Sequence, residues 1–193
     1  MNYKLSITNE ELKELPKTEF SGKIFLIDTL EKFDIAFPLL AENRILGFDT
    51  ETKPTFRKGK ENDVALLQLS SSDTAFLFRI NAMGLPEPLI HILENESVSK
   101  VGVAIKDDLR SLKKIRSFEP TGFIDLQDVA KEKGMKNNGL KKLAGIFLGK
   151  RISKSQRTTN WENEVLSPRQ LKYAATDAWI CNELYYKMVQ NNE

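Results

Sequence analysis

Cysteine and histidine are nearly absent from this sequence, which has one of each among its 193 residues, Cys181 and His91. A single cysteine cannot form an intramolecular disulfide or a cysteine-based zinc site, and a single histidine cannot form a multi-histidine metal site. His91 lies among apolar residues at helical spacing, which indicates a helix-surface or half-buried side chain rather than a member of a catalytic triad. Cys181 lies within a long predicted helix, where a cysteine is most often a small buried apolar residue. If the protein is an enzyme, we expect carboxylates to carry its chemistry.

Long apolar runs are also missing, so the sequence predicts neither a signal peptide nor a membrane-spanning helix. We expect a cytoplasmic protein in a reducing environment, with no membrane partner. Apolar residues make up 40% and charged residues 29%, which is ordinary for a globular domain. The net charge of +2 is close to neutral, so charge alone does not predict a nucleic-acid-binding protein. Nothing in the sequence predicts an oligomeric state.

The chain contains no internal repeat and no linker rich in proline, glycine and serine, which predicts a single domain over residues 1–193. Residues 1–22 are expected to form an N-terminal extension packed on it, with a short helix that ends at Pro16. The predicted strands cover residues 23–28, 45–50, 64–69, 75–80, 100–105 and 123–125. The predicted longer helices cover residues 30–42, 85–95, 107–115, about 126–133, 140–148 and 167 to about 190. A three-strand meander followed by alternating helix and strand predicts an α/β domain with a mixed sheet.

The segment FDTET places two carboxylates, Asp49 and Glu51, at alternate positions near the end of a predicted strand. Side chains alternate between the faces of a strand, so both carboxylates point to the same face. Two carboxylates this close repel each other, and each raises the cost of ionising the other. A divalent cation that prefers oxygen ligands, Mg²⁺ or Mn²⁺, relieves this repulsion. A solvated strand end is the alternative, and it is the favoured one if this pair is taken alone.

Tyr173 and Asp177 are four residues apart on the last predicted helix, so their side chains share one face. Apolar residues occur on two sides of this helix, which predicts that it is covered on both and that Asp177 points inward. A buried carboxylate is costly without a partner, and a metal ion is one partner that lowers the cost. A helix cap or a salt bridge with a nearby lysine is the alternative.

Asp108 follows another predicted strand and begins a helix. It shares the spacing of a core-facing stripe with Leu112 and Ile115, which predicts that its carboxylate points inward. Its neighbour Asp107 falls on the side of Arg110 and is expected to face outward near the helix start. The alternative for Asp108 is a simple N-terminal helix charge.

Together these residues form an ordered set: D-x-E on a strand, an aspartate after a later strand, and Y-x-x-x-D on a closing helix. In order and spacing the set resembles the DEDDy branch of the DnaQ-like 3′–5′ exonucleases, and the resemblance covers nearly the whole chain. It is closest to Werner-type exonuclease domains and more distant from ribonuclease D. The resemblance implies a ribonuclease H-like fold, a mixed β-sheet flanked by helices. The similar stretches are LGFDTET, VALLQLS, KVGVAIKDDLRSL, TTNWE and LSPRQLKYAATDA.

The resemblance also implies a two-metal mechanism with Mg²⁺ or Mn²⁺. Asp49 is expected to bridge both ions, and Glu51 and Asp177 to complete the site of the ion that activates water. Asp108 is expected to support the second ion through water, and Tyr173 to hydrogen-bond the attacking water. Two ions about 4 Å apart can stabilise both the attacking and the leaving oxygen of a phosphodiester.

Two predicted loops, 52–60 and 150–157, combine basic residues with a nearby aromatic residue. This pattern suits single-stranded nucleic acid, through phosphate contacts and base stacking. A solvated loop is an equally good interpretation of each. The sequence thus predicts a single strand or a 3′ end as the partner, without distinguishing DNA from RNA. The residues assigned to substrate contact are Thr50, Phe56, Arg57, Lys58, Lys154 and Arg157.

Three functions are compatible with these patterns. The leading one is a metal-dependent 3′–5′ exonuclease that releases nucleoside 5′-monophosphates. The second is a nucleic-acid-binding module that has lost catalysis, which the intact set of costly inward acids argues against. The third is a phosphodiesterase that acts on very short oligonucleotides or on a nucleotide derivative.

Overall fold

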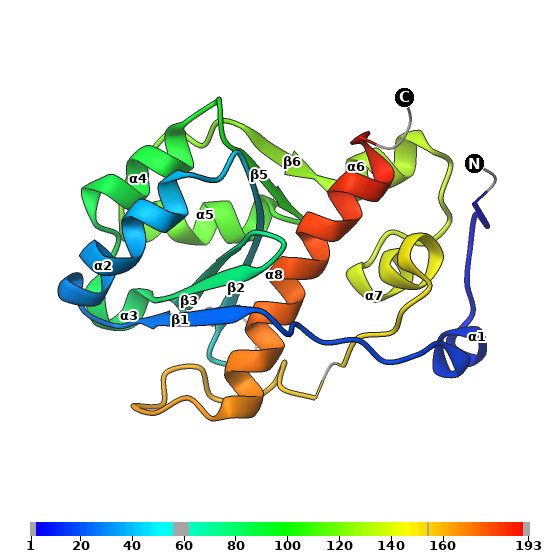
Figure 1. Cartoon of the computed structure of the whole chain (residues 1–193), viewed down its shortest axis with the longest axis horizontal. Helices are drawn as coiled ribbons and strands as arrows, with labels where there is room; N and C mark the ends of the chain where they lie inside the picture. Colours follow the sequence, from blue (N-terminus) through cyan, green and yellow to red (C-terminus); the bar gives the residue numbers. More distant parts are fainter. Residues whose placement is uncertain (1–2, 56–61, 154, 191–193) are drawn as a thin grey trace.

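The computed structural model describes residues 3–55, 62–153 and 155–190 (Figure 1). At its centre is a six-stranded mixed sheet with the order β1-β4-β3-β2-β5-β6. The strands are β1 (Lys23–Ile27), β2 (Ile45–Thr52), β3 (Val64–Ser70), β4 (Thr74–Arg79), β5 (Ser99–Gly102) and β6 (Phe123–Asp125). The antiparallel meander consists of β2, β3 and β4. The other three pairings, β1 with β4, β2 with β5 and β5 with β6, are parallel.

Helices cover both faces of this sheet, which confirms the predicted α/β domain with a mixed sheet flanked by helices (Figure 1). One face packs on α2 (Leu30–Ala41), α4 (Glu87–Glu94) and α5 (Lys106–Ile115), with Phe48 and Phe76 in the shared core. The other face is crossed by α8 (Pro168–Met188), beside α6 (Leu126–Glu132) and α7 (Leu140–Leu143). The remaining helices are α1 (Asn9–Glu14) and α3 (Ile80–Met83). Within the described part of the chain, each helix falls short of the length and apolar character needed to cross a membrane.

The long helix α8 begins where its capping sequence predicts. The Ser167 hydroxyl accepts a hydrogen bond from the Gln170 N–H at 3.3 Å, and the Gln170 side chain accepts one from the Ser167 N–H at 3.0 Å. This reciprocal arrangement satisfies two N–H groups that lack intrahelical partners. The Gln170 side-chain amide also donates to the Thr159 hydroxyl at 3.1 Å and to the Asn160 carbonyl at 3.2 Å, which ties the first turn of α8 to the preceding loop.

Besides small shifts at the ends of elements and the short helix α3, which was not predicted, two elements differ from the sequence prediction. The strand expected to run to residue 105 ends at Gly102, because Ala104 adopts a left-handed conformation with φ of 64°. The Asp125 carboxylate accepts hydrogen bonds from the N–H groups of Ala104 and Ile105, at 2.9 and 3.1 Å, and stabilises this turn. The helix expected over 140–148 is α-helical only to Leu143 and continues as η1, a π-helix (Ala144–Leu148). The first difference sets where α5 begins, and with it the position of Asp108.

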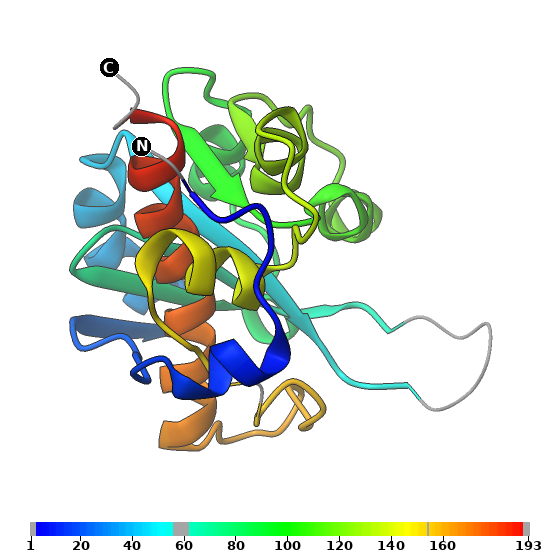
Figure 2. The ribbon, with the colours of Figure 1, turned by 90° about the vertical axis from the view of Figure 1, so that its right-hand side faces the viewer.

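Residues 3–22 lie against the rest of the domain. The Lys142 ammonium donates a hydrogen bond to the Ile7 carbonyl at 2.6 Å, and the Ile7 N–H donates to the Asn137 side chain at 3.1 Å. Further along, Phe20 is buried against α8 and its N–H donates to the Thr176 hydroxyl. Figure 2 shows this N-terminal segment (dark blue) running beside the helical segment around α7 (yellow).

Candidate active site

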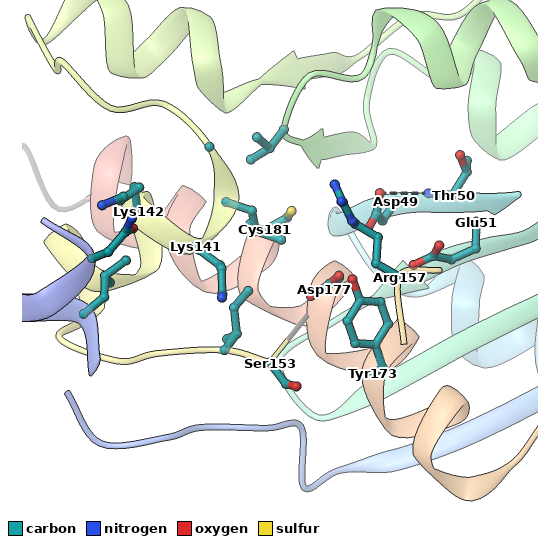
Figure 3. Close-up of a pocket in the computed structure, with 16 residues that line it drawn as sticks. Asp49, Thr50, Glu51, Lys141, Lys142, Ser153, Arg157, Tyr173, Asp177 and Cys181 are labelled. Carbon is teal, nitrogen blue, oxygen red and sulfur yellow. Dashed lines mark hydrogen bonds between the residues drawn. The ribbon is translucent and has the colours of Figure 1, made fainter. Parts of the chain in front are cut away.

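Three carboxylates, Asp49, Glu51 and Asp177, come together between β2 and α8 (Figure 3). Each contributes an oxygen, and these three oxygens lie within 4.8 Å of one another. Asp49 and Glu51 share one face of β2 because they are two residues apart. Asp177 reaches them because α8 crosses that same face, so residues more than a hundred positions apart in the sequence form one cluster.

The close approach of α8 to β2 depends on Gly47, which lies two residues before Asp49 on the same face of the strand. A Cβ atom at position 47 would lie 1.8 Å from the carbonyl oxygen of Ala178, far inside van der Waals contact. Ala178 directly follows Asp177 on the helix. The absence of a side chain at Gly47 therefore sets the distance between Asp177 and the two carboxylates of β2.

The electrostatics of the cluster suit a divalent cation. Burial, reinforced by the charges of Asp177 and Asp108, raises the pKa of Asp49 well above its usual value. Burial and the charges of Asp49 and Asp177 raise the pKa of Glu51 to about 10. Ionising all three neighbouring acids without a counterion is unfavourable, and a bound divalent cation removes this conflict. An all-oxygen donor set is the one that hard divalent cations prefer.

Asp108 lies apart from this three-acid cluster, at the start of α5. Its carboxylate accepts a hydrogen bond from the Thr50 hydroxyl at 2.5 Å, and burial raises its pKa to about 6. Asp107, one position earlier, is 82% exposed in its side chain and pairs with Arg110 at 2.9 Å. The helical period thus separates the two aspartates as predicted, with Asp108 inward and Asp107 outward.

Tyr173 and Arg157 complete the lining near the acids (Figure 3). Tyr173 lies one turn before Asp177 on α8, and burial together with the charge of Asp177 raises the pKa of its phenol. The Tyr173 hydroxyl therefore keeps its proton at neutral pH. Arg157 comes from the loop before α8, and its positive charge acts on Glu51 to oppose the rise in that pKa. The prediction that Arg157 belongs to the site is consistent with this position.

The acids lie in a cleft of about 490 Å³. Thr50 lines it, and its hydroxyl is bonded to Asp108, so its contact with substrate stays a prediction. The other predicted contacts, Phe56, Arg57, Lys58 and Lys154, lie outside the described residues, so their roles stay predictions. Sequence reasoning missed most of the far side of the cleft, which is formed by Asn9, Leu12, Lys141 and Lys142, whereas Ile152 and Ser153 of this side lie in the predicted basic loop 150–157. The basic pair in LKKL was a usable signal, whereas Asn9 and Leu12 carried none.

Neither the single cysteine nor the single histidine is placed to act as a nucleophile or as a catalytic base. Cys181 lines the cleft one turn after Asp177, but it is buried and the pKa of its thiol is raised, which keeps it protonated. His91 has a side chain that is 68% exposed on α4, where it lies 3.4 Å from Glu87. The carboxylates are therefore the groups suited to chemistry in this cleft.

A mixed sheet covered on both faces, with an acidic cluster between β2 and α8, defines a ribonuclease H-like nuclease domain. Within this class the chain belongs to the 3′–5′ exonuclease family, whose family model matches residues 24–192.

Similar proteins agree with this assignment. The chain is 36% identical over 186 residues to the bifunctional 3′–5′ exonuclease/ATP-dependent helicase WRN of Mus musculus, a match that covers 90% of this chain and 13% of the relative. The chain thus corresponds to a small part of that longer protein. The EXO domain of Aedes aegypti Nibbler superposes with a TM-score of 0.80 and 25% identity, covering 90% of this chain and 91% of that one. Escherichia coli RNase D, an exoribonuclease, has a TM-score of 0.77 at 23% identity, covers 90% of this chain and 45% of that one, and shows the fold alone.

Replacing Gly47 with alanine is expected to lower the free energy of unfolding by about 1–3 kcal/mol, the usual cost of inserting a carbon into a packed interior. Because α8 must then move away from β2, the Asp177 carboxylate also leaves the cluster and nuclease activity falls. Urea denaturation and a nuclease assay measure the two effects. Gly139→Ala is the matched control for stability, because a Cβ there meets no atom within 4 Å. Equal stability of the two variants would show that the packing of α8 on β2 does not depend on Gly47.

Proposed function

We propose that this protein is a metal-dependent 3′–5′ exonuclease, which hydrolyses the last phosphodiester bond of a nucleic acid strand and releases a nucleoside 5′-monophosphate. One observation carries the proposal: the oxygens of Asp49, Glu51 and Asp177 meet within 4.8 Å in an open cleft of a 3′–5′ exonuclease family member. A domain that only binds nucleic acid gains nothing from three neighbouring acids that are buried or partly buried and that repel one another.

Two Mg²⁺ or Mn²⁺ ions are the proposed cofactors, held by Asp49, Glu51 and Asp177, with Asp108 in a supporting position. The Asp108 carboxylate lies outside the three-acid cluster and is bonded to Thr50, which is consistent with an indirect contact through water. When bound, such ions neutralise the substrate phosphate and stabilise the attacking and leaving oxygens. The raised pKa values of Asp49 and Glu51 fit this assignment, because cations are what lower them again.

The side chains of the cleft have separate proposed tasks in the hydrolysis. Tyr173 keeps its proton, so its hydroxyl positions the attacking water by hydrogen bonding rather than accepting the proton. Glu51, whose charge acts on Tyr173, would lie beside that water. Arg157 offers its guanidinium to the phosphate, because the planar fork of N–H donors matches the spacing of two phosphate oxygens. Water forms a bond to phosphorus as the bond to the 3′-oxygen breaks; the water loses a proton to solvent and the leaving 3′-oxygen takes one up, which leaves a shortened strand with a free 3′-hydroxyl and a nucleoside 5′-monophosphate.

The proposed substrate is a single strand or a 3′ end, of DNA or RNA. An open cleft with basic residues near the acids supports this choice, because phosphate contacts supply sequence-independent affinity. A phosphodiesterase restricted to very short oligonucleotides is the alternative. The cytoplasmic location inferred from the sequence remains a prediction.

A length series of 5′-labelled DNA and RNA strands, from dinucleotides upward, tests the function. With Mg²⁺ or Mn²⁺ we expect stepwise 3′ shortening and release of nucleoside 5′-monophosphates, and with excess EDTA we expect no cleavage. Activity confined to the shortest strands would favour the alternative. Full activity in EDTA, or binding without cleavage under every metal condition, would rule out the proposed mechanism.

A further inference from the structure

The N-terminal segment, residues 3–22, precedes the part of the chain that matches the exonuclease family, residues 24–192, yet it forms part of the active-site cleft. Asn9 and Leu12 of α1 line the same cleft as Asp49 and Asp177. We propose that this segment, together with Lys141 and Arg151, forms a groove that binds the single-stranded part of the substrate lying 5′ of the scissile phosphate. The inference rests on the proposed exonuclease function and extends it to a second binding surface.

The groove continues from the acids to the surface of the molecule. A second hollow of about 460 Å³ adjoins the active-site cleft, and Asn9, Leu12, Lys141 and Ile152 line both of them. A released mononucleotide needs no such continuation, because nothing is attached beyond it. The strand on the 5′ side of the scissile bond is a polymer, so it needs a continuous binding surface that leads away from the acids. The two adjoining hollows supply such a surface.

The charges in the second hollow favour a phosphodiester backbone. Three of the residues that line it are basic, Lys13, Lys141 and Arg151, and one is acidic, Glu10. The carboxylate cluster repels phosphates, so attraction for the remainder of the strand has to come from outside that cluster. Lys13 is exposed and, within the described residues, makes no side-chain hydrogen bond or ion pair, which leaves its ammonium available for a phosphate. Leu12 adds an apolar surface for a base or a sugar.

Hydrogen bonds and packing hold the N-terminal segment, which forms one wall of the groove, in place before any substrate binds. The Arg151 guanidinium donates to the Leu15 carbonyl at 2.8 Å, and the Thr18 N–H donates to the Arg151 carbonyl at 2.9 Å. Leu12 packs so closely on η1 that a Cβ at Gly145 would lie 2.3 Å from its side chain. A surface organised in advance loses little conformational entropy on binding, so its phosphate contacts contribute more of their energy to affinity.

The test replaces Lys13 with glutamate, because this side chain is exposed and outside the core. Lys131→Glu, on α6, is the control with the same change of charge at an exposed lysine that lines neither hollow. The kcat/KM for each protein is measured on a dinucleotide and on a strand of about twelve nucleotides, as DNA and as RNA. Binding of the longer strand to Asp49→Asn protein, with and without Lys13→Glu, is measured by fluorescence anisotropy across a salt series.

For Lys13→Glu we expect kcat/KM on the longer strand to fall roughly five- to tenfold, with less than about a twofold change on the dinucleotide. The slope of log affinity against log salt should decrease by about 0.7, the value for one phosphate contact on a single strand. A parallel loss for DNA and RNA indicates that the backbone is recognised, and a loss on one of them assigns the groove to that nucleic acid.

An equal effect of Lys13→Glu and Lys131→Glu on kcat/KM, or an equal loss of kcat/KM on the dinucleotide and the longer strand, would show that the proposed groove does not bind the strand. If the wild-type protein cleaves normally in that case, only this inference is wrong. If the wild-type protein neither cleaves nor binds any of the strands, the proposed exonuclease function is wrong as well.

Discussion

Replacement of Asp49 by asparagine is expected to lower the exonuclease rate by at least about 1,000-fold, in line with the loss of a central electrostatic contact in an active site. Asp49 lies at the centre of the cluster, with the charges of both Asp177 and Asp108 acting on it. Asparagine has the same size and keeps an oxygen, so the change removes charge with little change in shape. A stepwise assay on a 5′-labelled strand in Mg²⁺ and in Mn²⁺ measures the loss.

The same substitution is expected to stabilise the metal-free protein, increasingly so as the pH rises. The pKa of Asp49 is raised in the folded state, so the folded protein binds its proton more tightly than the unfolded chain does. The free energy of unfolding of the wild type therefore falls as the pH rises above about 4, the pKa of an aspartate in an unfolded chain. Asparagine does not titrate, so the contribution of Asp49 to this decrease is absent from the variant, while the contribution of Glu51, whose pKa is also raised, remains.

Urea denaturation in EDTA at several pH values between about 5 and 9 measures this difference in stability. With Mn²⁺ present the wild type should become the more stable of the two proteins, because a cation that binds the folded wild type stabilises it by mass action. Asp28→Asn, at a side chain in an ordinary surface pair with Lys32, is a suitable control. A variant that cleaves at the wild-type rate would place the reaction centre elsewhere in the molecule.

Asp108→Asn is expected to abolish most of the cleavage, whereas Asp107→Asn should retain most of it. The two aspartates are adjacent in the sequence, but only Asp108 points inward, where its carboxylate accepts the hydrogen bond from Thr50. Removing its charge takes away the proposed support of the second ion. Asp107 faces solvent beside Arg110, so its loss costs at most the roughly 0.3–1 kcal/mol of a charge near a helix N-terminus.

Rates and metal titrations of these two variants under identical conditions test the assignment. The apparent affinity for Mg²⁺ should weaken for Asp108→Asn and stay close to the wild-type value for Asp107→Asn. Urea denaturation of both serves as the folding control. The reverse order of activities would show that Asp107, rather than Asp108, supports the second ion.

Local periodicity accounts for what the sequence by itself determined. The period of two along β2 places Asp49 and Glu51 on one face, and the helical period separates Asp108 from Asp107. The capping box of Ser167 and Gln170 determines the start of α8, and hence the face shared by Tyr173 and Asp177. Each of these inferences involves residues a few positions apart, whose relative directions depend only on the type of local structure.

Contacts between segments far apart in the sequence determined the assembly of the acidic cluster, the end of β5 and the N-terminal wall of the cleft. The cluster forms because Gly47 lets α8 approach β2, a consequence of shape matching over more than a hundred residues. The early end of β5 depends on Asp125, whose carboxylate binds the N–H groups of a turn about twenty residues earlier in the chain. The N-terminal wall of the cleft depends on hydrogen bonds from Lys142 and Arg151 to the carbonyls of residues 7 and 15. No periodic pattern encodes such contacts, because they arise only when the packed sheet and helices bring these segments to the same place.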